Sequence, residues 1–272
     1  MKPSFLKKPL FLWSLTIFIT LASVVYQRIT GPTHPLRGSI EMKDEKIKFR
    51  LLRTHVTTND ARMAIAVPSS EVTGELRWRR FRSHDDWTTE GLPREGDNLV
   101  VTIPKQPAAG KVMYEITLTG EAGKRHALTE TPVIMRFKGA VPTVILWPHI
   151  ILMFAAMLLA TRTGLEAIVK RDGAFRLAVW TSCLLFVGGL IFGPIVQKYA
   201  FGAYWTGWPF GHDLTDTKTG IAMIFWLIAL WRGRDHAKGR IWMIIAALVA
   251  LLVYLIPHSM LGSELDYTKM GQ

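Results

Sequence analysis

The stretch Thr143–Thr161, TVILWPHIILMFAAMLLAT, decides the fold class of this chain. It contains no Asp, Glu, Lys or Arg. A helix needs about 20 mostly apolar residues to cross the hydrocarbon core of a bilayer. We therefore predict a membrane-spanning helix here. Pro148 and His149 lie inside the run, where a helix-bending residue and an ionisable residue are unusual.

Similar apolar runs occur four more times, so the sequence predicts five spans in total. The other four are Leu10–Tyr26, Leu177–Gln197, Asp216–Trp231 and Ile241–Ile256. The run that begins at Asp216 is the weakest, because its apolar core is short and the helix must recruit polar residues before it. We interpret residues 1–26 as an uncleaved N-terminal membrane anchor. A cleaved signal sequence is the alternative, because lysines precede the apolar run.

The composition excludes several classes of protein. The chain has 272 residues, 49% of them hydrophobic, and a formal net charge of +12. These values exclude a disordered chain and an ordinary soluble enzyme. The single cysteine, Cys183, excludes an intrachain disulfide framework and a cysteine-based metal finger.

The basic residues indicate an orientation, because cytoplasmic loops of membrane proteins are enriched in Lys and Arg. We predict that the N-terminus, loop 162–176 and loop 232–240 face the cytoplasm of a bacterium whose inner membrane holds the chain. Segment 27–142, loop 198–218 and the C-terminus then face the periplasm. The cytoplasmic set is Lys2, Lys7, Lys8, Arg162, Lys170, Arg171, Arg176, Arg232, Arg234, Lys238 and Arg240, against Lys198, Lys218 and Lys269 outside. The arginine-rich stretch 77–82 is exported in this topology, so the predicted partners are the lipid bilayer and other membrane-complex subunits, with no nucleic acid.

Residues 27–142 are predicted to form an exported all-β sandwich domain, followed by a four-helix transmembrane unit in residues 143–272. Short apolar stretches that alternate with polar residues are separated by turn signals, which is typical of a β-sandwich. The predicted strands are Ile40–Met42, Ile47–Arg53, Ala61–Val67, Gly74–Phe81, Asn98–Ile103, Val112–Thr119 and Ala127–Phe137.

Residues 39–138 resemble fibronectin type III and immunoglobulin-like modules. The resemblance is carried by Leu76–Arg79, by Trp87 after a polar turn, by Leu99–Pro104 and by Gly110–Ile116. The chain lacks the cysteine pair of antibody-type domains. The resemblance implies a fold and an interaction role, and it implies no chemistry.

Three histidines come to the same membrane face in the predicted topology, although they belong to separate segments. They are His149, His212 and His258, and carboxylates lie on the same side at Asp213, Asp216 and Glu264. Met153 follows His149 by one helical turn. Histidine with methionine suits copper or haem iron, whereas histidine with carboxylates suits zinc. We predict all six residues as candidate metal ligands, and His149 and His258 as candidate axial ligands of a haem b.

Each of these residues also has a structural interpretation. Asp213 is well placed to cap a helix, and Asp216 suits its first turn. The aromatic loop 198–218 is typical of a membrane interface. Gly189 and Gly193 form a GxxxG motif, which favours close helix packing.

The sequence supports three hypotheses about function. The first is a membrane protein that binds a transition metal or haem at its outer face, with a role in electron transfer or metal handling. The second is a non-catalytic accessory or assembly subunit that docks partners through the β-sandwich. The third is a membrane-embedded, metal-dependent hydrolase. No motif identifies a catalytic residue, so enzymatic activity stays open.

Overall fold

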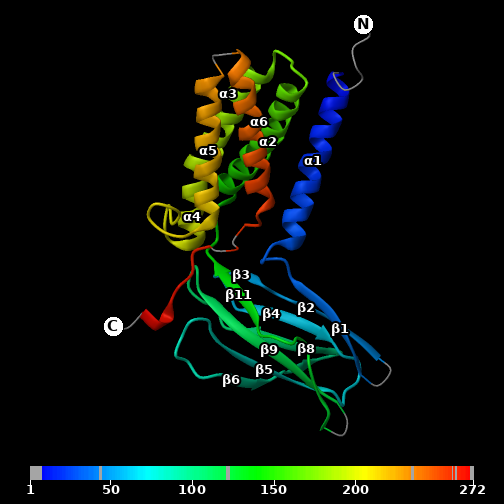
Figure 1. Ribbon diagram of the computed structural model, residues 1–272. Coiled ribbons are helices and arrows are strands. Elements are labelled where there is room, and N and C mark those ends of the chain that lie inside the picture. Colours follow the sequence, from blue (N-terminus) through cyan, green and yellow to red (C-terminus); the bar gives the residue numbers. More distant parts are fainter. Residues whose placement is uncertain are drawn as a thin grey trace. The chain divides into compact units, whose positions relative to one another are not determined.

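The computed structural model describes residues 8–42, 45–120, 123–233, 236–258, 260 and 262–269. The chain divides into two compact units (Figure 1). The helical unit comprises Met1–Pro32, Val141–Tyr199 and Ala203–Gly262. The β unit comprises Thr33–Ala140, Ala200–Gly202 and Ser263–Gln272.

The helical unit contains the apolar stretches of the sequence. Helix α1 covers Pro9–Thr30 and α2 covers Thr143–Ile168. A continuous helical run follows, made of α3 (Ala174–Leu185), the π-helical segment η3 (Phe186–Phe192) and α4 (Gly193–Phe201). Helices α5 (Leu214–Arg232) and α6 (His236–Leu255) complete it. Within the described residues, three helices are long and apolar enough to cross a membrane: α1, α2 and the run Ala174–Phe201.

Two helices extend beyond their predicted ends, which corrects the predicted loop 162–176. Helix α2 continues to Ile168, and α3 already begins at Ala174. The charged residues Arg162 and Glu166 therefore lie inside α2, where both are buried. They form an ion pair one turn apart, and this pairing makes their burial tolerable.

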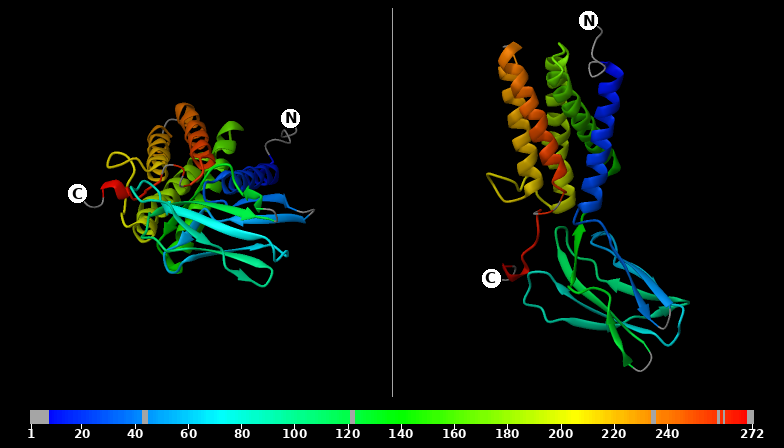
Figure 2. Two further views of the ribbon diagram at one scale, coloured as in Figure 1. Left: turned by 90° about the horizontal axis from the view of Figure 1, so that it is seen from below. Right: turned by 45° about the vertical axis from the view of Figure 1, so that its right-hand side comes forward.

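Small residues let the helices approach closely. Helix α2 packs against α3 and α6, α5 packs against α6, and α1 lies beside α2 and α6 (Figure 2). A Cβ atom on Gly164 of α2 would meet the Cβ of Ala247 in α6 at 2.7 Å. Alanines dominate the buried positions of this unit. Close packing of small residues is the usual source of helix association in lipid, where apolar transfer contributes little.

The β unit contains three sheets. Strands β1 (Leu36–Met42) and β2 (Glu45–Leu51) form an antiparallel pair. The second sheet has the order β3 (Thr54–Val56), β11 (Val133–Lys138), β9 (Lys111–Thr119), β5 (Thr73–Arg80) and β6 (Thr88–Gly91), with β10 (Arg125–Ala127) on β9. The third has the order β4 (Ala61–Ala66), β8 (Asn98–Ile103) and β7 (Arg94–Glu95).

One apolar core joins the sheets of this unit. Strand β9 shows why, since its buried residues alternate with partly exposed ones and place Val112, Tyr114, Ile116 and Leu118 in the core. The Tyr114 hydroxyl donates to the Leu52 carbonyl oxygen at 2.8 Å, which satisfies the buried polar end. Strands β3 and β11 are parallel, so the second sheet is mixed. This arrangement is compatible with a β-sandwich, and the two units together fit a membrane protein that carries a β-rich domain.

Candidate binding site between the helices

His149 lies in the second turn of α2, directly after Pro148, and its ring is held by a backbone carbonyl. The Nδ1 atom is 2.9 Å from the carbonyl oxygen of Gly188. A carbonyl oxygen can only accept, so Nδ1 carries the proton. In the neutral ring Nε2 then carries the lone pair, which is the state that a metal ligand requires.

The carbonyl that holds His149 belongs to the π-helical segment η3. The N–H of Gly193 also bonds the Gly188 oxygen, which is the wide spacing of a π-helix. Segment η3 can approach α2 because Gly188 has no side chain: a Cβ atom there would meet the Leu152 Cβ at 2.8 Å and the Met153 Sδ at 3.3 Å. The π-helical turn therefore brings one carbonyl to the His149 ring.

His258 follows the end of α6. At this end, two side chains from other helices donate hydrogen bonds to backbone carbonyl oxygens. Pro257 cannot continue the helix. The Gln27 Nε2 of α1 donates to the Tyr254 oxygen at 2.7 Å, and the Lys218 Nζ of α5 donates to the Ile256 oxygen at 2.6 Å. These bonds tie α1 and α5 to the segment that carries His258.

His149 and His258 line the same cavity, which has a volume of about 280 Å³. The Tyr254 hydroxyl also lies there and donates to the Met153 carbonyl oxygen at 3.1 Å. Most of the wall is apolar. The lining residues are Ser23, Val24, Gln27, Leu146, His149, Ile150, Met153, Phe154, Met157, Val196, Tyr254 and His258. Two imidazoles and two thioethers are the groups here that bind transition metals, and they suit copper or haem iron.

The carboxylates Asp213 and Asp216 hold the aromatic loop and do not line this cavity. Asp213 Oδ1 accepts from the Thr215 N–H at 2.8 Å and caps α5. Asp216 Oδ2 accepts from the Thr206 N–H at 2.7 Å, the Gly207 N–H at 3.1 Å and the Gln197 Nε2 at 2.9 Å. The loop before α5 is thereby fastened to α4 and α5.

His212 and the aromatic rings of the same loop face outward. His212 is exposed, and it is not one of the residues that line the cavity of His149 and His258. Trp208 is 70% exposed and Phe210 is 84% exposed. Exposed aromatic rings of this kind are typical of a membrane interface or of a surface that meets a partner.

Glu264 belongs to the β unit, where it binds two basic side chains. It pairs with Lys111 of β9 and with Arg82, two residues after the end of β5. The Leu265 N–H donates to the Ala109 oxygen at 3.1 Å, and the Thr268 N–H donates to the Arg82 oxygen at 3.2 Å. Burial lowers the pKa of Lys111, and the Glu264 carboxylate opposes that shift. The contacts of Glu264 are therefore those of a residue that holds the C-terminal segment on the β unit.

Replacing Glu264 by glutamine is expected to release this segment without affecting the cavity of His149 and His258. Lys111 would keep its partly buried charge without an anionic partner, so the β unit should lose about 1–3 kcal/mol. Hydrogen exchange of residues 263–269 by mass spectrometry should become faster. Glu130→Gln, elsewhere in the β unit, is the control and should leave the exchange unchanged. Unchanged exchange in Glu264→Gln would contradict the anchoring role.

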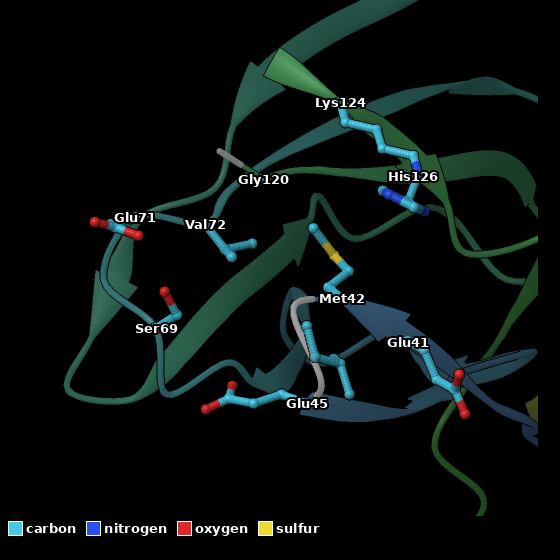
Figure 3. Close-up of a pocket in the computed structure, with 10 residues that line it drawn as sticks. Glu41, Met42, Glu45, Ser69, Glu71, Val72, Gly120, Lys124 and His126 are labelled. Atoms are coloured by element: carbon cyan, nitrogen blue, oxygen red, sulfur yellow. The ribbon is translucent and has the colours of Figure 1, made fainter. Parts of the chain in front are cut away.

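A second pocket, of about 260 Å³, lies in the β unit. Figure 3 shows Lys124 and His126 on one side of it and Glu71 on another, while the carboxylates of Glu41 and Glu45 point in different directions. Within the described ranges of the chain, no three His, Cys, Asp or Glu side chains gather as a metal site of that composition would need. The cavity of His149 and His258 has a mostly apolar lining to which two histidines and two methionines contribute.

The sequence analysis did not select Gln27, which lines the cavity, or Lys218, which bonds the segment that carries His258. The sequence analysis counted Lys218 only as a charge on an outer loop. In the structure its side chain is buried in the first turns of α5. The sequence did carry a signal for them, namely a lysine and a glutamine within or next to apolar runs. Polar residues at such places usually have a partner, so both could have been selected as candidates.

Comparison of the chain with protein-family models, with curated proteins and with solved structures gave no match. The functional conclusion therefore rests on the site alone.

Proposed function

We propose that this chain is a five-span protein of a bacterial inner membrane that holds a transition-metal centre at its periplasmic face. The centre is copper or haem iron bound by His149 and His258, and its role is electron transfer or metal handling. The observation that carries the proposal is the Nδ1 contact of His149 with the Gly188 carbonyl, in a cavity that His258 also lines. Because Nδ1 carries the proton in that contact, Nε2 is the ring atom that can bind the metal.

The five-span topology is supported by the helix surfaces. Helices α5 and α6 expose large apolar side chains as the longer helices do; Leu227 is 52% exposed and Leu252 is 62% exposed. Large exposed apolar surfaces need lipid or a partner to cover them. The β unit, which we propose to be a fibronectin type III or immunoglobulin-like module, would be exported between the first and second spans.

The C-terminal segment supports the same topology. Residues after α6 bond to the β unit, and the chain of the β unit connects α1 to α2. The proposed topology accordingly puts the C-terminal end of α6 on the same side of the membrane as the start of α2. The Gly139 N–H also bonds the Ala200 oxygen at the end of α4. Five alternating spans satisfy all of these connections.

The ligand set favours copper or haem over a zinc hydrolase. A hydrolytic zinc site uses three protein ligands with an open position, and a carboxylate often serves as general base. The described lining of the cavity contains two histidines and two methionines, and no carboxylate. Thioethers prefer Cu(I) and haem iron.

The test is an optical spectrum with elemental analysis on gently purified full-length protein, repeated on His149→Ala and His258→Ala. We expect a Soret band or near-stoichiometric copper in the native chain and its loss in both variants. His212→Ala is the matched control and should retain the centre, because His212 is exposed outside the cavity. A metal-free, colourless protein that folds would overturn the proposal.

An accessory-subunit function is the second candidate, and a surface of the β unit favours it. The guanidinium groups of Arg77 and Arg79 each lie 5.0 Å from the centre of the Trp87 ring. Arginine and tryptophan are enriched where proteins bind each other. If the purified chain carries no metal and retains other subunits, this candidate replaces the first.

A further inference from the structure

A basic cleft lies at the end of the helical unit where α1 and α3 begin and α2 ends. Its volume is about 600 Å³. The lining contains four basic and two acidic side chains, so the cleft is positive overall. These residues are Arg162, Lys170, Arg171, Arg176, Glu166 and Asp172.

Arg162 is a buried side chain of this cleft whose hydrogen-bond donors are only partly paired. Its side chain is 4% exposed, yet its Nε and Nη1 have no hydrogen-bond partner within the described part of the chain. Only Nη2 is used, in the ion pair with Glu166. Buried donors of a guanidinium are costly when they are left unpaired, so their presence points to a ligand that accepts hydrogen bonds.

The neighbours of Arg162 hold its side chain in place for such a ligand. Glu166 also pairs with Arg171, whose Nε lies 2.9 Å from Glu166 Oε2. Trp13 of α1 stacks on Arg162, with the guanidinium carbon 4.9 Å from the ring centre. The stacked ring fixes the plane of the guanidinium, which leaves its fork preorganised.

We propose that this cleft binds the phosphate of an anionic phospholipid of the inner leaflet. The inference rests on the proposed membrane topology, which places this end of the helices at the cytoplasmic face. Planar guanidinium groups bind phosphate oxygens through paired hydrogen bonds. Basic pockets between spans at this face suit anionic head groups. Trp13, which is 37% exposed in the second turn of α1, is of a residue type that is enriched at membrane interfaces.

Native mass spectrometry of the full-length protein, stripped of lipid and titrated with phosphatidylglycerol or phosphatidylcholine, tests this inference. We expect the native chain to bind phosphatidylglycerol about tenfold more tightly or better, and Arg162→Gln to lose that preference. Arg176→Gln, at the exposed rim, should weaken binding several-fold without endangering the fold. Arg232→Gln, an exposed arginine at the end of α5 outside the cleft, is the control and should bind as the native chain does.

Three other results would contradict the proposed lipid site. Equal binding of the two lipids, or native affinity in both Arg162→Gln and Arg176→Gln, would overturn it. Displacement of the lipid by millimolar inorganic phosphate would also overturn it, because the ligand would then be a soluble phosphate. Alkaline carbonate extraction of membranes checks separately that the chain is an integral membrane protein, and metal content checks the outer site. Failure of the proposed function is therefore distinguishable from failure of the lipid site.

Discussion

Replacing Asp216 by alanine is expected to destabilise the helical unit by about 3 kcal/mol or more. Two backbone N–H groups, those of Thr206 and Gly207, would lose the Asp216 carboxylate as acceptor, and the Gln197 amide would lose one of its acceptors. Each buried donor left without a partner costs about 1–3 kcal/mol. Thermal unfolding of the purified protein should show the loss, and limited proteolysis should cut the loop between Gly202 and Asp213 sooner.

The control for this variant is Asp213→Ala, which removes a neighbouring buried carboxylate. Asp213 caps α5 through the Thr215 N–H, and its other oxygen makes one long contact with the loop, from Thr206 Oγ1 at 3.4 Å. The loss of such a cap costs about 1 kcal/mol. We therefore expect a clearly smaller effect at Asp213 and little change in loop cleavage. Equal effects of the two substitutions would mean that Asp216 acts only through the helix end and does not fasten the loop.

The apolar runs located every long helix of this chain, because hydrophobicity over about 20 residues is a strong and local signal. Helix ends were less accurate. Arg162 and Glu166 predicted a loop, but their ion pair allows α2 to continue past them. The π-helical segment η3 was not predictable, since it depends on the contact of Gly188 with α2 and not on local propensity.

The sequence predicted strands correctly where apolar and polar residues alternate over enough positions to show a period of two. The predicted strand 127–137 is divided into β10 and β11 around Pro132, which cannot donate to a ladder. Strands β3, β6 and β7 are too short to show a period. The GxxxG motif of Gly189 and Gly193 indicated close helix packing. Its first glycine is tightly packed, since a Cβ atom on Gly189 would meet Thr219 at 2.7 Å. The second is not, because a Cβ atom on Gly193 would have its nearest neighbour at 3.7 Å, which is ordinary contact.

The candidate site was predictable only in part, and for a physical reason. The predicted topology brings His149 and His258 to one membrane face, and a histidine within an apolar helix is conspicuous in a sequence. The groups that position them are backbone carbonyls, of Gly188, Tyr254 and Ile256, and every residue has a carbonyl. Which carbonyl is used depends on tertiary packing, and no residue type marks it.

The substitution Gly188→Ala is expected to weaken metal or haem binding by about 10–100-fold, although Gly188 itself is no ligand. Loss of a group that orients a metal-binding histidine typically has this effect. The added Cβ would meet the Leu152 Cβ at 2.8 Å, and because that atom is fixed on the α2 backbone, η3 and α2 must separate. The Gly188 carbonyl would then move away from His149 Nδ1. Titration of the metal-free protein with Cu(I) or haem measures the affinity.

Gly220→Ala is the matched control, since it adds the same methyl group to another helix of the unit. A Cβ atom at Gly220 would have its nearest neighbour, in the Trp205 ring, at 3.7 Å, which is ordinary contact. We expect native affinity there, and a slight gain in helix stability from alanine. If Gly188→Ala binds as tightly as Gly220→Ala while both remain folded, the carbonyl of Gly188 does not orient His149 for a metal. Binding that falls in Gly188→Ala alone would show that the π-helical turn, and not only the two histidines, builds the centre.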